Sequence, residues 1–330
     1  MGGCRGSGYG RGMAPTRAAV GVSFDRAFPA SLVTEFAREV DGKVDELWLI
    51  EDCFYTTAPP LAAAALAVTE ELRIGLGILP AVARTAAVTA MEIATLSSLA
   101  PGRVVGGIGH GVQSWMGQMG VRPASPLTAL TEVLDAVRGL LRGERLTVEG
   151  RYVTLQDVQL EHLPDPVPPV LAGIRGPKSM AVAGRSADGV LLADSAGPGF
   201  IPLAREQAGN PANFQVSVFA PLITAPTRRE AYALASGWLA DQLAEPTASL
   251  QSTPFYAELR TLYETGGTEA LVEVPADWWA ELGAIGTLDD AAAHLTALEE
   301  AGADAVALVP APDPEVAKGQ LADVIRLAAR

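Results

Sequence analysis

The sequence is poor in cysteine, histidine and basic residues, and each shortage excludes a class of protein. Only Cys4 and Cys53 are present, so no disulfide framework can form and a cytoplasmic location is expected. The three histidines are not clustered with Cys or carboxylates at ligand spacing, which predicts no metal site. A net charge of −14 without a Lys/Arg cluster argues against a nucleic-acid partner.

Long apolar runs are also missing from the chain. No apolar stretch approaches the roughly 20 residues that a membrane span needs, so no membrane partner is expected and small molecules are the favoured ligands. The 330 residues are nonetheless 49% hydrophobic, which is enough for a large core. Residues 1–18 contain six glycines and three arginines but no apolar segment. We therefore expect a disordered tail at 1–18 and one folded domain at 19–330.

Short apolar runs recur through the rest of the chain with helix-forming sequence between most of them. They are continuous rather than alternating, which is typical of parallel strands buried on both faces. Eight such units in about this length predict an α/β fold, the (β/α)8 TIM barrel, with a doubly wound open sheet as the alternative. The runs lie at 19–24, 46–50, 73–79, 104–108, 170–173, 189–192, 214–220 and 305–310.

Capping signals and two unusual segments complete the expected architecture. Ser125-Pro126 and Thr287 begin apolar-periodic helices that end near Gly143 and Gly302, and an alanine-rich helix is expected over 86–99. Residues 143–169 predict a small antiparallel excursion that forms a lip over one end of the barrel. Residues 221–286 are rich in aromatics, and this insertion either walls the active site or forms a peripheral helical pair.

The stretch from Val104 to Met119 is the strongest sign of a binding site. A buried strand ends in alternating glycines around His110, and Gln113, Trp115 and Met116 follow at once. Glycine allows the backbone to approach a ligand closely, whereas Gln, Trp and Met supply an adaptable and mostly apolar wall. The pattern predicts a planar cofactor, with a plain glycine-rich turn as the alternative.

Six motifs, taken in order from about residue 19 to 310, resemble the luciferase-like monooxygenase superfamily. Within it, the resemblance is to the coenzyme F420-dependent oxidoreductases, the branch of methylenetetrahydromethanopterin reductase and related enzymes. This implies an F420-dependent barrel enzyme whose site lies at the C-terminal strand ends, and a homodimer. An FMN-dependent monooxygenase and a non-catalytic coenzyme-binding homologue are the alternatives. The motifs are Leu47–Phe54, Ile74–Ile78, Glu92–Arg103, Gly107–Trp115, Ala172–Ser179 and Ala187–Ser195.

The resemblance also implies which residues bind the coenzyme. It places a non-proline cis peptide between Gly77 and Ile78 behind the deazaflavin ring and a cofactor-contacting carboxylate at Asp52. Backbone N–H groups of two βα loops would hold the coenzyme phosphate. The remaining cofactor-binding residues predicted in this way are Gly109, Gly111, Ala172, Gly173, Ile174, Lys178, Asp194 and Ser195.

Two departures from the family restrict the chemistry. Cys53 stands where related sugar-phosphate and alcohol dehydrogenases carry histidine, and Val112 stands where other relatives carry Glu or Asp. The missing base argues against alcohol oxidation and leaves hydride transfer from the reduced coenzyme to a C=C, C=N or C=O bond of a hydrophobic small molecule. The proton would come from His110, from Glu51 or from water, with His110 favoured because imidazole titrates near neutral pH.

The remaining side chains near these motifs receive simpler roles. Cys53, Gln113, Trp115 and Met116 are predicted to bind the substrate. The other two histidines, His162 and His294, are predicted to be solvated surface residues.

Overall fold

The computed structural model describes residues 17–192 and 196–330, so most of the predicted tail lies outside it. The two tail residues that it does describe pack against the folded part. Arg17 forms an ion pair with Asp45, with Nη1 and Oδ2 3.1 Å apart, and Ala18 is buried. The folded part therefore begins at least two residues before the predicted boundary.

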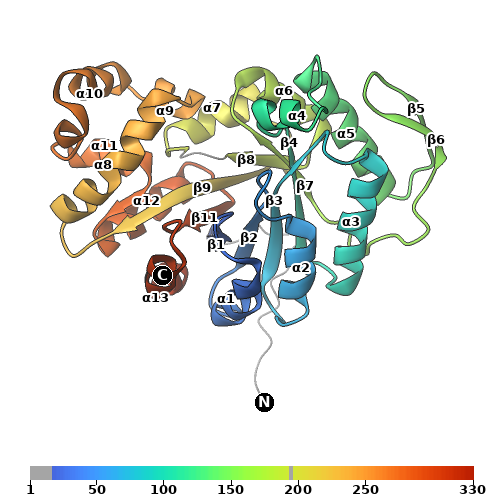
Figure 1. Ribbon diagram of the computed structural model, residues 1–330, viewed down its shortest axis with the longest axis horizontal. Coiled ribbons are helices and arrows are strands. Elements are labelled where there is room, and N and C mark those ends of the chain that lie inside the picture. Colours follow the sequence, from blue (N-terminus) through green and yellow to red (C-terminus); the bar gives the residue numbers. More distant parts are fainter. Residues whose placement is uncertain (1–16, 193–195) are drawn as a thin grey trace.

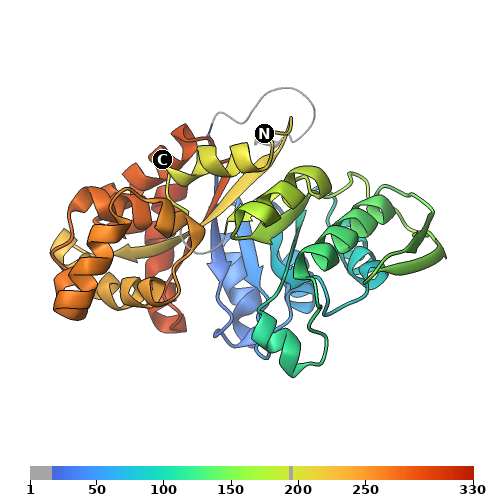
Figure 2. The same ribbon diagram turned by 90° about the horizontal axis from the view of Figure 1, so that it is seen from above.

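Eight parallel strands close into a barrel within the described residues. Each strand pairs with the next along the chain, β9 pairs with both β8 and β11, and β11 pairs back with β1 (Figures 1 and 2). This closure confirms the TIM barrel and excludes the open sheet, which would leave two edges. The strands coincide with the eight apolar runs: β1 (Ala19–Phe24), β2 (Glu46–Ile50), β3 (Arg73–Pro80), β4 (Val104–Gly109), β7 (Val170–Ile174), β8 (Gly189–Leu192), β9 (Gln215–Thr224) and β11 (Ala305–Val309).

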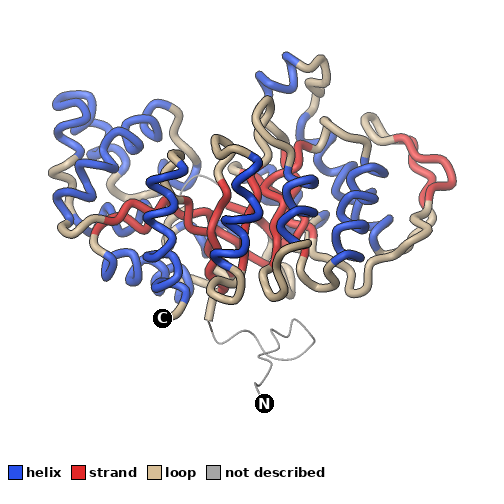
Figure 3. Tube along the Cα trace, turned by 60° about the horizontal axis from the view of Figure 1, so that its bottom comes forward, coloured by secondary structure: helices blue, strands red, loops and turns tan. Residues whose placement is uncertain are grey.

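Helices cover the outside of the barrel (Figure 3). The main hydrophobic core lies between the strands and these helices. No helix in the described ranges is both long and apolar enough to cross a membrane. After the short 3-10 turn η1 (Ala30–Leu32), the covering helices are α1 (Val33–Val40), α2 (Ala58–Leu66), α3 (Ala86–Leu99), α5 (Pro126–Leu141), α6 (Pro177–Ser186), α7 (Phe200–Gln207), α12 (Leu288–Glu300) and α13 (Pro314–Ala328).

The predicted helix caps are present. The Ser125 hydroxyl accepts from the Thr128 N–H at the start of α5, and Thr287 and Asp290 form a reciprocal capping box at the start of α12. Gly143 and Gly302 follow these helices with φ of +84° and +100°, which glycine adopts easily. The sequence therefore located these two helices through their ends.

A second, smaller cluster fills the inside of the barrel. Trp48 and Phe219 meet there edge to face, with ring centroids 5.5 Å apart. Leu47 and Leu49 flank Trp48 on β2 but belong to the outer core, as the alternation of a strand requires. The two aromatic rings form a floor beneath the C-terminal ends of the strands.

The antiparallel excursion exists but is not a lip over the barrel. Its strands β5 (Leu146–Glu149) and β6 (Thr154–Val158) lie beyond α5 at the right edge of Figure 1. Glu132 of α5 holds the turn of this hairpin by accepting backbone N–H groups from Arg151, Tyr152 and Val153. These bonds keep the hairpin along the outer side of α5, which corrects the predicted position.

The aromatic insertion forms a helical lobe with its own core. Tyr232 stacks on Trp279 and Phe255 stacks on Trp278, with centroid distances of 5.0 and 4.7 Å. The short strand β10 (Ala284–Gly286) pairs in parallel with the last three residues of β9. The lobe also contains α8 (Arg228–Ala244), α9 (Ala248–Ser252), α10 (Tyr256–Leu271) and α11 (Ala276–Leu282).

His294 contradicts the sequence prediction. It was expected on the surface, but only 2% of it is exposed, and its Nδ1 lies 2.7 Å from the Ala280 carbonyl oxygen of α11. The lobe packs over α12 and buries this side chain. Burial lowers the pKa of His294 to about 4, although the Ala280 carbonyl opposes this shift.

Candidate active site

The loops at the C-terminal ends of β2, β3, β4 and β7 converge, as the barrel prediction requires. The Glu51 N–H donates to the Gly77 carbonyl over 3.3 Å, and the Ala81 N–H donates to the Gly109 carbonyl over 2.8 Å. His110 and Ser179, which follow β4 and β7, lie within hydrogen-bond distance of each other. Most of the predicted site residues therefore belong to one end of the barrel.

The peptide bond between Gly77 and Ile78 is cis, which confirms the expectation for this pair. The Ile78 side chain lies against glycines of β4 and β7. A Cβ at Gly173 would be 2.6 Å from Ile78 Cγ2, and a Cβ at Gly109 would collide with Ile78 Cδ1. A larger residue at either position would displace Ile78, and at Gly109 it would also lie 2.5 Å from the Gly173 carbonyl oxygen, so glycine fits best at both.

The Glu51 carboxylate is hydrogen-bonded to neighbouring groups of the protein rather than free at the mouth. The Arg84 guanidinium binds both of its oxygens, with Nη1–Oε1 and Nη2–Oε2 distances of 2.5 and 2.9 Å. The Ala58 N–H at the start of α2 also donates to Oε2 over 2.8 Å. Both oxygens of Glu51 thus already accept hydrogen bonds from neighbouring groups. The partner Arg84 was missed because nothing in its local sequence marks it.

Arg84 contacts a second carboxylate on α3. Its Nε lies 3.0 Å from Glu92 Oε2. Burial works to lower the pKa of Arg84, but hydrogen bonds and charge attraction from Glu51 and Glu92 raise it above its ordinary value. The guanidinium therefore stays charged between the two carboxylates.

Asp52 and Cys53 follow Glu51 on the same loop. Asp52 Oδ2 pairs with Arg26 Nη1 at 2.7 Å, and the Arg26 guanidinium lies 5.1 Å from the centre of the exposed Tyr55 ring. Burial raises the pKa of the Cys53 thiol, and the nearby charges of Glu51 and Asp52 add to the shift. Cys53 is thus a neutral thiol near pH 7, which does not favour it as an acid-base residue.

His110 bridges the helices that follow β4 and β7. Its Nδ1 lies 3.2 Å from the Pro126 carbonyl oxygen, and its Nε2 lies 2.8 Å from Ser179 Oγ. A carbonyl can only accept, so Nδ1 carries the proton and Nε2 accepts from the Ser179 hydroxyl in the neutral ring. Burial lowers the pKa of His110 despite the Pro126 carbonyl. Ser179 was not predicted as a site residue, although it ends one of the motifs that carry the resemblance.

The short helix α4 (Gln113–Gln118) continues the glycine turn. Gln113 Nε2 donates to the carbonyls of His110 and Gly111 over 3.1 and 3.3 Å, which fixes the turn. Met116 is fully buried, and a Cβ at Gly111 would lie 3.1 Å from its Cε. Met116 therefore supports the turn from inside and exposes no surface to a substrate, which corrects its predicted role. Trp115 is half-buried.

The segment from the end of β7 to the start of α6 agrees only in part with its predicted role in coenzyme binding. Ala172 and Ile174 belong to the core that faces the helices, so their side chains point away from the mouth, and only their backbone can meet a coenzyme. Lys178 is exposed near the start of α6. Asp194 and Ser195 lie outside the described residues. Just after them, the Gly199 N–H donates to Glu281 Oε2 over 3.2 Å.

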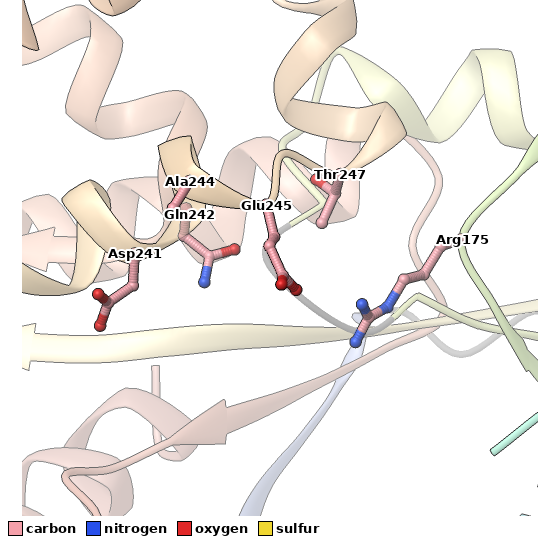
Figure 4. A pocket seen from close by; sticks show the side chains of 6 residues that line it. All are labelled: Arg175, Asp241, Gln242, Ala244, Glu245 and Thr247. Atoms are coloured by element: carbon pink, nitrogen blue, oxygen red, sulfur yellow. The ribbon is translucent and has the colours of Figure 1, made fainter. Parts of the chain in front are cut away.

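A cavity of about 400 Å³ separates the end of β7 from the helical lobe (Figure 4). Glu245 and Arg175 extend toward one another across it, which places the lobe beside the mouth and favours the walling alternative for the insertion. Among residues 17–192 and 196–330, no group of three or more His, Cys, Asp or Glu is placed to hold a metal ion. The lining residues are Arg175, Asp241, Gln242, Ala244, Glu245 and Thr247.

Comparison with known proteins identifies the family. Residues 13–305 match the family profile described as luciferase-like monooxygenase. The chain belongs to the luciferase-like monooxygenase family. The motifs that carried the resemblance all lie within the matched region of this luciferase-like chain.

Individual luciferase-like relatives include two kinds of enzyme. The 5,10-methylenetetrahydromethanopterin reductase of Methanolobus tindarius is 28% identical over 203 residues, which cover 60% of this chain and 56% of that protein. The F420-dependent glucose-6-phosphate dehydrogenase of Beutenbergia cavernae is 31% identical over 144 residues, which cover 42% of this chain and 43% of that protein. The chain thus spans about half the length of each relative.

A solved structure supports the fold over nearly the whole chain. The coenzyme F420-dependent tetrahydromethanopterin reductase from Methanopyrus kandleri superposes with a TM-score of 0.73 and 19% identity, covering 96% of this chain and 98% of that one. This likeness supports the barrel fold described above.

Proposed function

We propose that the protein is a coenzyme F420-dependent oxidoreductase that reduces a C=C, C=N or C=O bond of a hydrophobic small molecule. The observation that carries this proposal is the packing of Ile78 at the barrel mouth. Gly109 and Gly173 are buried, and the partly exposed Ile78 side chain lies in the space that Cβ atoms at these positions would need, directly against β4 and β7. A flat ring can contact such a low apolar surface closely. The similar dehydrogenase of Beutenbergia cavernae is F420-dependent by name. So is the tetrahydromethanopterin reductase of Methanopyrus kandleri, whose structure superposes on this one.

The residues that would hold the coenzyme surround this surface. Gly77, Ile78, Gly109 and Gly173 would back the ring, and Gly111 would let the following turn approach it. The partly exposed carboxylate of Asp52 has one oxygen on Arg26 and would offer the other as an acceptor. Backbone N–H groups near Lys178 at the start of α6, with Asp194 and Ser195, would receive the phosphate. When bound, the reduced deazaflavin would supply the hydride.

The proton would travel through His110 and Ser179. In the neutral state Nε2 is an acceptor, so the imidazole must first take up a proton from solvent. Nε2–H would then donate to Ser179 Oγ, and the Ser179 hydroxyl proton would be free to move to the reduced acceptor. Glu51 is the weaker candidate because donors occupy both of its oxygens.

The substrate side of the mouth would be mostly apolar. Cys53 is a neutral thiol, Trp115 is half-buried, and Phe54 and Met119 are exposed at the adjoining loops. Gln113 would supply the polar contact. These side chains support a hydrophobic acceptor.

The family description favours one second candidate, an FMN-dependent monooxygenase. A fluorescence titration of the purified protein with coenzyme F420 and with FMN separates the two. We expect saturable binding of F420 and much weaker binding of FMN. Co-purified FMN with oxygen consumption would overturn the proposal, and binding of F420 without turnover of any acceptor would indicate a non-catalytic homologue.

We also propose a homodimer formed through α2 and α3. Val88, Met91 and Leu99 are exposed at helical spacing on α3 and border an apolar groove of about 310 Å³ against Pro59 and Ala63 of α2. A second copy would bury this face, because exposed apolar stripes of this kind mark association surfaces. We further propose a cytoplasmic location, because a chain with only two cysteines is typical of proteins in a reducing compartment.

A further inference from the structure

The Arg84 side chain connects three segments at the barrel mouth. It lies in the loop between β3 and α3, its two terminal nitrogens bind Glu51 at the end of β2, and its Nε reaches Glu92 on α3. Only 15% of its side chain is exposed. A planar guanidinium can hold two carboxylates at once in a fixed orientation, which a lysine ammonium cannot reproduce.

Glu51, which Arg84 holds in place, contacts the residues that would surround the coenzyme. Its backbone N–H donates to the Gly77 carbonyl, and its Oε2 accepts from the Ala58 N–H. The loop that carries Asp52 and Cys53 runs between these two anchors. Fixing the Glu51 side chain therefore fixes the start of that loop at Glu51 and its end at Ala58. Glu51 also lies next to Gly77 of β3, where the ring would bind.

We propose that Arg84 is a positioning residue that sets the coenzyme-binding geometry of the mouth through Glu51. Its guanidinium binds Glu51 and Glu92, so it acts through these carboxylates rather than on the coenzyme or the substrate. This inference rests on the proposed function for its effect on coenzyme binding, but its effect on the loop does not depend on any ligand. It also assigns Glu51 to the scaffold instead of the proton path.

The chain offers a closely matched control. Arg138 of α5 is 16% exposed, and its Nη2 lies 2.5 Å from Asp188 Oδ1. Asp188 directly precedes β8 and accepts the Val170 N–H at the start of β7, so this pair secures the opposite end of the barrel. Arg84→Met and Arg138→Met remove the same group from two arginines of nearly equal exposure, although Glu51 is 6% and Asp188 33% exposed, and only the first arginine adjoins the mouth.

Hydrogen–deuterium exchange on the ligand-free protein gives the first readout. We expect Arg84→Met to speed exchange in residues 51–58 and 77–82, and Arg138→Met to speed it near 170 and 188 instead. Arg84→Lys should restore part of the protection, because one charged contact survives. Unchanged exchange at 51–58 in Arg84→Met would overturn the proposal.

Titration with coenzyme F420 gives the second readout, at a temperature where all variants are folded. The Kd should rise about tenfold in Arg84→Met, the equivalent of one lost charged hydrogen bond, and change less than about twofold in Arg138→Met. Equal weakening by both variants would assign Arg84 to general stability and overturn the proposal. Wild-type protein that does not bind F420 would contradict the proposed function, while the exchange data would still decide the role of Arg84.

Discussion

The side chain of Ile78 fills the space that a side chain at Gly109 would need. A Cβ at Gly109 would collide with Ile78 Cδ1 and would lie 2.5 Å from the Gly173 carbonyl oxygen. The flexible end of Ile78 can move, but the backbone oxygen of β7 cannot do so without parting the strands. The Ile78 surface at the mouth is therefore built by packing between three adjacent strands.

Gly109→Ala tests this packing. We expect it to lower the free energy of unfolding by about 1–3 kcal/mol through overpacking and to weaken coenzyme binding, because Ile78 must shift toward the ring position. Chemical denaturation and F420 titration measure the two effects. Gly319→Ala in α13 is the control, since a Cβ there meets nothing within 4 Å. Wild-type affinity in Gly109→Ala would mean that the coenzyme does not lie on this surface.

His110 gives a prediction for the pH profile of reduction. Burial lowers its pKa below 6.5, and the proposed relay needs the protonated ring. The rate should therefore rise as the pH falls below 6.5, and this rise should disappear in His110→Ala and in Ser179→Ala. His110→Ala should reduce turnover about 100-fold or more while F420 affinity stays nearly intact.

The exposed His162 supplies the control for this profile. His162→Ala should keep the wild-type pH dependence with any acceptor that is turned over. A pH-independent rate in the wild type would contradict the relay, and wild-type turnover in both His110→Ala and Glu51→Gln would assign the proton to solvent.

His294 predicts how stability depends on pH. Its pKa falls from 6.5 to about 4 on folding, so the unfolded chain binds a proton between these values and the folded chain does not. Stability from the neutral ring is complete above about 6.5 and decreases as the pH falls toward 4, by about 3 kcal/mol in total. Urea unfolding at several pH values measures this loss.

The His294→Asn variant isolates the contribution of this histidine. An asparagine amide can still donate to the Ala280 carbonyl but does not titrate. The stability difference between wild type and variant should therefore change with pH in the window from about 6.5 to about 4 and stay constant above it. A difference that is flat throughout would show that His294 is solvated.

The proposed dimer predicts a different response from two equally exposed leucines. Leu99 on α3 is 65% exposed and Leu234 on α8 is 67% exposed. Leu99→Glu should shift the protein from dimer to monomer in analytical ultracentrifugation, because it places a charge in the apolar groove, whereas Leu234→Glu should leave the dimer intact. A monomeric wild type, or loss of the dimer in both variants, would contradict the α2–α3 interface.

Local patterns in the sequence determined the barrel and much of its mouth. Each of the eight strands is a continuous apolar run, and the helix ends at Ser125 and Thr287 are marked by capping side chains, so neither needs a distant partner to be recognised. The cis pair at Gly77 and the glycine turn at His110 were found because family motifs are also local.

Only the tertiary structure decided which distant groups meet. Arg84 and Glu51 are 33 positions apart, and His110 and Ser179 are 69 apart, so no spacing rule joins them. His294 looked exposed because α12 alone does not reveal that the helical lobe covers it, and Met116 looked accessible although it lies beneath Gly111. Burial and hydrogen-bond partners depend on packing between elements, and the contacts of Glu51 with Arg84 and Ala58 favour a scaffold role for a residue that the sequence predicted as an acid.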